Sequence, residues 1–168
     1  RTMKKISKQD TPENKKKLYA EMAERIHKGD SDAKNDVVEL LKNKSYGIGS
    51  QEKNLAIHLA EEQKMTEAVP GLYDLLNQVT IAGIGEKVAD PSNALINIGI
   101  GGQQALLDCI EKDDAATIPY QTIAAILFHW FDEDKTALKK FLTETEKEAS
   151  AKNKSKFSAI IKVVDNWK

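Results

Sequence analysis

The sequence lacks most of the features that mark a protein's chemistry directly. Its 168 residues include one cysteine, Cys109, which excludes an internal disulfide framework, and no Cys/His spacing resembles a zinc site. No run approaches the ~18 apolar residues that a membrane-spanning helix needs. We therefore expect no metal, no cofactor and no insertion into a membrane.

Net charge is also nearly absent, because 25 Lys and Arg residues balance 26 Asp and Glu residues. A net charge of −1 gives no overall attraction to nucleic acid, so no nucleic-acid partner is expected. Apolar residues make up 40% of the chain and charged residues 30%. This balance is typical of a soluble globular protein rather than a disordered one.

The charges are distributed unevenly along the chain. Residues 1–28 hold nine basic and four acidic side chains, whereas residues 29–131 hold seven basic and fifteen acidic ones. The lysine-rich start is either a solvated end that keeps the chain soluble or a basic arm for an acidic partner or a membrane surface. The acidic middle favours a partner that is basic or polar.

Apolar residues recur with helical spacing almost everywhere, and no segment alternates with period two. The pattern predicts an all-α chain with its first helix over 12–28, because Pro12 suits a first turn and Gly29 ends it. Further helices are expected to start after the following signals: Ser31 or Asp32, Ser50, Thr66, Asp90-Pro91-Ser92, Gln103, Pro119 and Asp132-Glu133-Asp134. A last helix is expected over 153–168, and the glycine-bearing stretch 80–89 is expected to be a connection.

One sequence pattern recurs at intervals of just over thirty residues. Val69–Leu76 aligns with Gln103–Ile110 at a shift of 34, and with Lys135–Leu142 at a further 32. Each copy follows a helix rich in apolar residues and alanine, and each begins a second helix. Such a period indicates helix pairs that stack, since a single pair has too little core to be stable alone.

The segment Leu55–Ala60 followed by Glu67–Leu72 resembles a HEAT repeat of the phycobilisome-lyase type. Ala94–Gly99 followed by Ala105–Leu107 is similar to the same pattern, and the resemblance covers residues 55–142. It implies a short, irregular HEAT- or armadillo-like right-handed solenoid of antiparallel helix pairs. We expect one helical-repeat domain over 1–168, with 1–11 disordered and the helices at 12–28 and 153–168 as terminal caps.

Several polar residues of the second helices fall outside the apolar stripe. In arrays of this family that helix lines the concave face, so the resemblance implies a polar binding strip. Its members are Tyr73, Asp74, Asn77, Gln104, Asp108, Glu111 and Lys140. The alternative is ordinary solvated surface.

Other candidate sites are better explained by structural roles than by catalysis or ligand binding. Gly-Ile-Gly occurs at 47–49, 83–85 and 99–101, but neither a dinucleotide fingerprint nor a P-loop is present, so we expect interhelical turns. His27, His58 and His129 fall on separate expected helices, and His129 is expected to be partly buried. Cys109 is expected to be an inert core thiol.

These patterns predict a non-catalytic protein-interaction or scaffold module, with no catalytic residues. Two alternatives stay open. One is a HEAT-like enzyme or accessory domain, lyase-like or DNA-repair-like, and the other is a fragment of a larger protein. The lone thiol and the lack of an export signal favour the cytoplasm, although a signal or anchor upstream of Arg1 would leave the same sequence.

Overall fold

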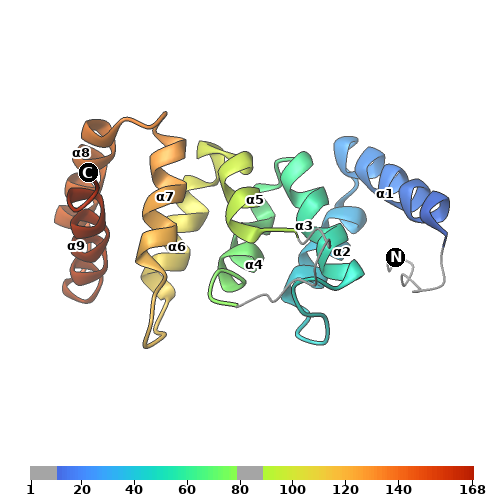
Figure 1. Cartoon of the computed structure of the whole chain (residues 1–168), viewed down its shortest axis with the longest axis horizontal. Helices are drawn as coiled ribbons and strands as arrows, with labels where there is room; N and C mark the ends of the chain where they lie inside the picture. Colours follow the sequence, from blue (N-terminus) through green and yellow to red (C-terminus); the bar gives the residue numbers. More distant parts are fainter. Residues whose placement is uncertain (1–10, 79–88) are drawn as a thin grey trace. The chain divides into compact units, whose positions relative to one another are not determined.

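The computed structural model describes residues 11–78 and 89–168, and Figure 1 shows its helices in chain order. Within these ranges all regular structure is helical and no strand occurs, so the expected all-α class is confirmed. Backbone contacts divide the chain into two compact units, one ending at Ile98 and one spanning Gly99–Lys168. Each unit is described separately below.

The first unit is built around α3. Its described helices are α1 (Pro12–His27), α2 (Ser31–Lys42), α3 (Gln51–Glu62), η1 (Thr66–Ala68), α4 (Val69–Asp74) and α5 (Pro91–Ile98). Helix α3 packs against α1, α2 and α5, and α4 packs against α2 and α5. The helix contacts bury the side chains of Met22, Ile26, Val37, Leu41, Ile57, Leu59, Leu72 and Leu95.

The second unit is built around α9. Its helices are η2 (Ile100–Gly102), α6 (Gln103–Lys112), α7 (Tyr120–Trp130), α8 (Lys135–Glu148) and α9 (Ala151–Asp165). Helix α9 packs against α6, α7 and α8, and it lies beside α8 in Figure 1. The core of this unit consists of Leu106, Ile110, Ile123, Leu127, Leu138, Phe157 and Ile160.

Polar caps fix several helix starts where the sequence predicts them. Thr11 accepts a hydrogen bond from Asn14 N, and Ser50 accepts one from Lys53 N. The predicted cap of the second helix is wrong. Asp30, rather than Ser31 or Asp32, is the N-cap, because its carboxylate accepts from the amides of residues 32 and 33 and is also ion-paired with Arg25.

Other boundaries differ by a few residues. The last helix begins at Ala151 rather than 153 and ends at Asp165, because the helix before it already ends at Glu148. The expectations for residues 1–10, and for the connection at 80–88 with its second Gly-Ile-Gly, lie outside the described residues. Of the two other Gly-Ile-Gly copies, the one at 47–49 is in the expected turn, whereas the one at 99–101 continues into η2 after Gly99. Gly49 and Gly99 have φ of +95° and +84°.

The end of α7 carries several bulky aromatic residues. The ring of Phe128 meets Trp167 edge-on at 5.2 Å between centroids, and Phe131 lies 4.9 Å from Phe141. Aromatic pairs of this geometry stabilise a core beyond their buried area. Bulky residues are accommodated here because rings from α8 and from the end of the chain pack against them.

Candidate functional site

In the first unit, the predicted strip residues are found around the end of α4. Asp74 is the last residue of that helix and is exposed, and Asn77 is exposed in the turn that follows. Tyr73 is different. Its side chain is buried with 6% exposure, so it belongs to the core, and we leave it out of the proposed surface.

Asp74 also lines a polar crevice of about 290 Å³. The crevice lies where the end of α2 approaches the end of α4, and its other lining residues are Leu41, Lys42, Asn43, Lys44, Lys53, Leu75 and Gln78. Lys42 and Lys44 bring ammonium groups and Asp74 brings a carboxylate. A crevice with both charges on its walls can hold a polar group that donates and accepts hydrogen bonds.

One of the residues that line this crevice is a buried lysine. Lys53 is 1% exposed, and its ammonium donates to the carbonyl oxygens of Leu40, Leu41 and Asn43 at 2.7, 2.9 and 2.9 Å. These carbonyls belong to the carboxyl end of α2, where no further helical turn can satisfy them. Burial lowers the pKa of Lys53, whereas the three acceptors favour its charged form.

In the second unit, three of the strip residues share one face of α6. Gln104, Asp108 and Glu111 are spaced by four and three residues, which places them in line along the helix. Gln104 and Asp108 are exposed, Glu111 is half-buried, and the Gln104 amide donates to Asp108 at 3.0 Å. Lys140 is exposed on α8. We refer to Gln104, Asp108 and Glu111 as the α6 face.

The end of the α6 face is positioned by a second buried lysine. Lys156 is 6% exposed and donates to the carbonyls of Ile110, Glu111 and Asp113 at 2.9, 2.9 and 2.7 Å. Nearby, Lys152 pairs with Asp114 and lowers the pKa of that carboxyl. The carboxyl end of α6 is therefore fixed to α9, which holds the α6 face in place.

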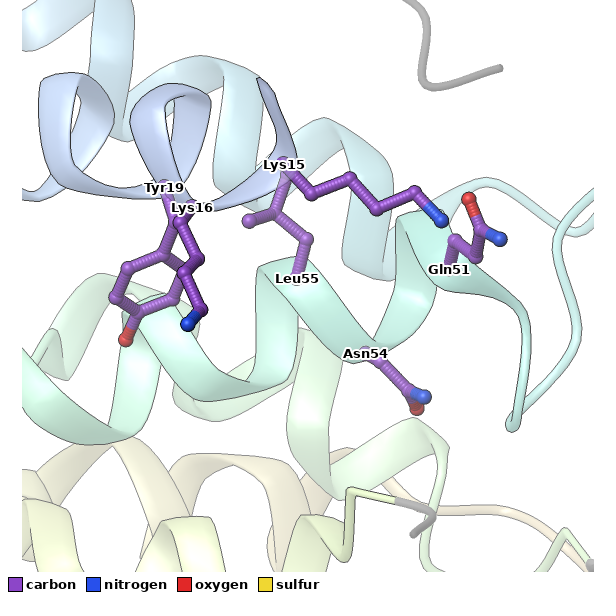
Figure 2. Close-up of a pocket in the computed structure, with 6 residues that line it drawn as sticks. All are labelled: Lys15, Lys16, Tyr19, Gln51, Asn54 and Leu55. Carbon is purple, nitrogen blue, oxygen red and sulfur yellow. The ribbon is translucent and has the colours of Figure 1, made fainter. Parts of the chain in front are cut away.

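A second cavity of the first unit lies between α1 and α3 and has a volume of about 340 Å³. Figure 2 shows the residues that line it, Lys15, Lys16 and Tyr19 from α1 and Gln51, Asn54 and Leu55 from α3. Burial, followed by the Glu62 carboxylate, raises the pKa of the Tyr19 hydroxyl.

The residues with catalytic or metal-binding potential are scattered. His58 lies 3.8 Å from Glu61, and His129 lies 3.5 Å from Glu133. The side chain of His129 is 45% exposed, and its ring meets that of Phe128 edge-on at 6.2 Å between centroids. Cys109 is half-buried. Among residues 11–78 and 89–168, no group of three or more His, Cys, Asp or Glu residues could hold a metal ion.

The sequence analysis did not identify the two buried lysines or the cavity between α1 and α3. The buried lysines carry a sequence signal, because Lys53 precedes Ala56, Ile57 and Ala60 by three, four and seven residues and so falls on the apolar stripe. The cavity between α1 and α3 carries none. Nothing in the spacing of Lys15, Lys16 and Tyr19 shows which helix packs beside them.

Comparison of the chain with protein-family models, with curated proteins and with solved structures gives no match. None of the helices in the described part of the chain combines the length and apolar character needed to cross a bilayer.

Proposed function

We propose that this chain is a non-catalytic protein-interaction module of stacked helix pairs. The observation that carries the proposal is the α6 face, on which Gln104 and Asp108 are exposed in line while Lys156 fixes the carboxyl end of the helix. A rigid helix that presents polar side chains loses little conformational entropy when a partner binds. Asp74 and Asn77 offer a second exposed polar area in the first unit.

The proposal includes a HEAT-like arrangement, a short right-handed solenoid, as the sequence repeat predicts. It is supported by the alternation of short helices and by Gly71, Ala105 and Ala137, small residues at equivalent repeat positions. In a solenoid the second helices line one concave face, which would join Asp74 and Asn77 to the α6 face and Lys140.

The partner that fits these residues is a protein with a basic or polar surface. Asp74, Asp108 and Glu111 are carboxylates, and complementary charge accelerates encounter more than it raises final affinity. Carboxylates of this kind lose attraction for a basic partner as salt increases, because exposed charges are screened over about 8 Å at physiological ionic strength.

A pull-down from the source cell tests the proposal. The wild-type chain is compared with the triple variant Asp74→Lys, Asp108→Lys and Glu111→Lys. A control with the same change in charge carries Glu13→Lys, Glu21→Lys and Glu148→Lys, three exposed positions away from the proposed surface. We expect one protein partner to be lost from the triple variant and retained by the control. Turnover of a small molecule without any protein partner would contradict the proposal.

A further inference from the structure

The tetrapeptide Lys-Asn-Lys-Ser occurs twice in the chain, and the fold holds its two copies differently. Residues 42–45 leave the end of α2 and enter the connection to α3, whereas residues 152–155 lie in the first turns of α9. In both copies one lysine directly precedes the serine and another lies three residues before it. Because these preceding residues are identical, the structure is the main difference between Ser45 and Ser155.

The copy at the end of α2 is exposed and held by few hydrogen bonds. The side chains of Asn43, Lys44 and Ser45 are all exposed. Ser45 N donates to Asn43 Oδ1 at 2.9 Å, and Tyr46 N donates to Asn43 O at 3.3 Å. Within the described ranges the Ser45 hydroxyl makes no hydrogen bond. Ser45 can therefore become extended by breaking these two contacts, and no helical turn has to unwind.

The copy in α9 is also exposed at its serine, but its backbone is fixed. Ser155 Oγ donates to the carbonyl of Lys152 at 3.1 Å, and Lys152 is paired with Asp114. The next residue, Lys156, is buried and donates to three carbonyls at the end of α6. To extend the chain around Ser155, the start of α9 would have to unwind and Lys156 would have to leave those carbonyls.

We propose that Ser45 is phosphorylated by a serine kinase that selects basic residues before the serine, and that Ser155 is not. Such a kinase holds its substrate segment extended, and Lys42 and Lys44 complement the charge of an acidic substrate groove. Ser45 Oγ attacks the γ-phosphorus of ATP while its proton passes to the catalytic carboxylate of the kinase. The bond from that phosphorus to the β–γ bridging oxygen breaks, and ADP leaves.

The phosphate would lie next to the polar crevice between the ends of α2 and α4. Lys42 and Lys44 line that crevice together with Lys53, and Asp74 supplies the carboxylate of its walls. A phosphoserine carries a charge of about −1.5 to −2 and accepts hydrogen bonds from nearby ammonium groups. Phosphorylation of Ser45 consequently offsets the excess of lysine over aspartate around the crevice.

The site is tested on the folded full chain, without any binding partner. A Ser7→Ala chain is incubated with magnesium ATP and the catalytic subunit of cyclic-AMP-dependent protein kinase, because Ser7 also has lysines two and three residues before it. Tandem mass spectrometry gives the rate at each serine. Short peptides of residues 39–48 and 149–158 measure the two copies without the fold. We expect the peptides to react within about threefold of each other, and Ser45 to react at least about tenfold faster than Ser155 in the folded chain.

Variants identify what the kinase recognises. Ser45→Ala should remove the phosphate from residues 42–45, and Lys42→Ala should lower the rate at Ser45 at least about fivefold. Lys17→Ala, an exposed position on α1, is the control and should leave that rate unchanged. Circular dichroism verifies that each variant is folded. Absence of phosphate at Ser45, a preference for Ser45 no larger than that between the two peptides, or an unchanged rate in Lys42→Ala would overturn the proposal.

Discussion

Lys53 and Lys156 cap the carboxyl ends of two different helices, α2 and α6, in the same way. Each ammonium donates to three carbonyl oxygens, and in both cases the acceptors are spaced as the first, second and fourth residues of a run, Leu40, Leu41 and Asn43 for one and Ile110, Glu111 and Asp113 for the other. The final carbonyls of a helix have no intrahelical donor. A lysine from another helix therefore replaces the glycine cap that more commonly ends a helix.

Removing either ammonium is expected to destabilise the protein. Lys53→Met and Lys156→Met keep the length and apolar stem of the side chain but remove three hydrogen bonds each. Two carbonyls then lose their lysine donor outright, because Asn43 O still accepts from Tyr46 N and Ile110 O from Asp113 N. We expect each to lower the free energy of unfolding by about 2–3 kcal/mol. Urea titration followed by circular dichroism measures the change.

The control for this prediction is Lys154→Met, an exposed position on α9, which should change stability by less than about 0.5 kcal/mol. Both tryptophans, Trp130 and Trp167, belong to the second unit. Tryptophan fluorescence should therefore report the Lys156→Met change directly. A Lys156→Met midpoint equal to that of the wild type would show that the cap contributes nothing.

Replacing Gly71 by alanine is expected to destabilise the protein, which is the opposite of the usual effect at a glycine within a helix. Replacing a helical glycine by alanine ordinarily stabilises a protein by about 0.5–1 kcal/mol. At Gly71, however, an added Cβ would lie 2.9 Å from Leu41 Cβ, which is fixed near the backbone of α2. Gly71→Ala should consequently lower the melting temperature.

The matched control is Gly47→Ala, where an added Cβ meets nothing within 4 Å and φ is not positive. It should leave the melting temperature within a degree or two of the wild-type value, about what a surface substitution causes. A Gly71→Ala protein as stable as the control would contradict the close approach of α2 and α4.

Asp36 is expected to oppose folding at neutral pH. The residue is 7% exposed, and its Oδ2 has no hydrogen-bond partner within the described ranges. Burial raises the pKa of this carboxyl, so the folded state binds its proton more tightly than the unfolded state does. Asp36→Asn should therefore raise the free energy of unfolding at pH 7 by about 1 kcal/mol.

The pH dependence gives a second check of this prediction. A raised pKa in the folded state contributes stability that is fully present below the unfolded pKa of 3.8 and is lost as pH rises through the folded pKa. The advantage of Asp36→Asn should consequently shrink as the pH falls from 7 towards 3.5. Glu39→Gln, exposed on the same helix, should show no such trend. If the stability gained by Asp36→Asn stays constant with pH, the ionisation of Asp36 is not the source of that gain.

Much of the fold was predictable because it depends on local signals. Thr11, Ser50 and Asp134 cap helices where the sequence predicts, since a short polar side chain before an apolar stripe has few other uses. The cap of α2 was misassigned because Ser31, Asp32 and Asp30 are chemically equivalent at that level. In the folded unit Asp30 differs from them because it accepts the amides of residues 32 and 33 and pairs with Arg25.

The candidate site was less predictable because it depends on which helices meet. Tyr73 fits a polar strip by spacing alone, yet contacts in the folded unit bury it. Tyr19 and Gln51, which line the cavity between α1 and α3, are 32 residues apart along the sequence, and no periodicity relates them.

Site-specific photo-crosslinking in the source cell tests the proposed function most directly. A benzophenone amino acid is introduced singly at Asn77, Gln104 or Lys140, and at the control positions His27 and Lys154, all of them exposed. We predict that the first three positions give an adduct with the same protein and that the two controls do not. Adducts of equal yield from the controls, or the absence of any protein adduct from Asn77, Gln104 and Lys140, would contradict a protein-binding surface at these residues.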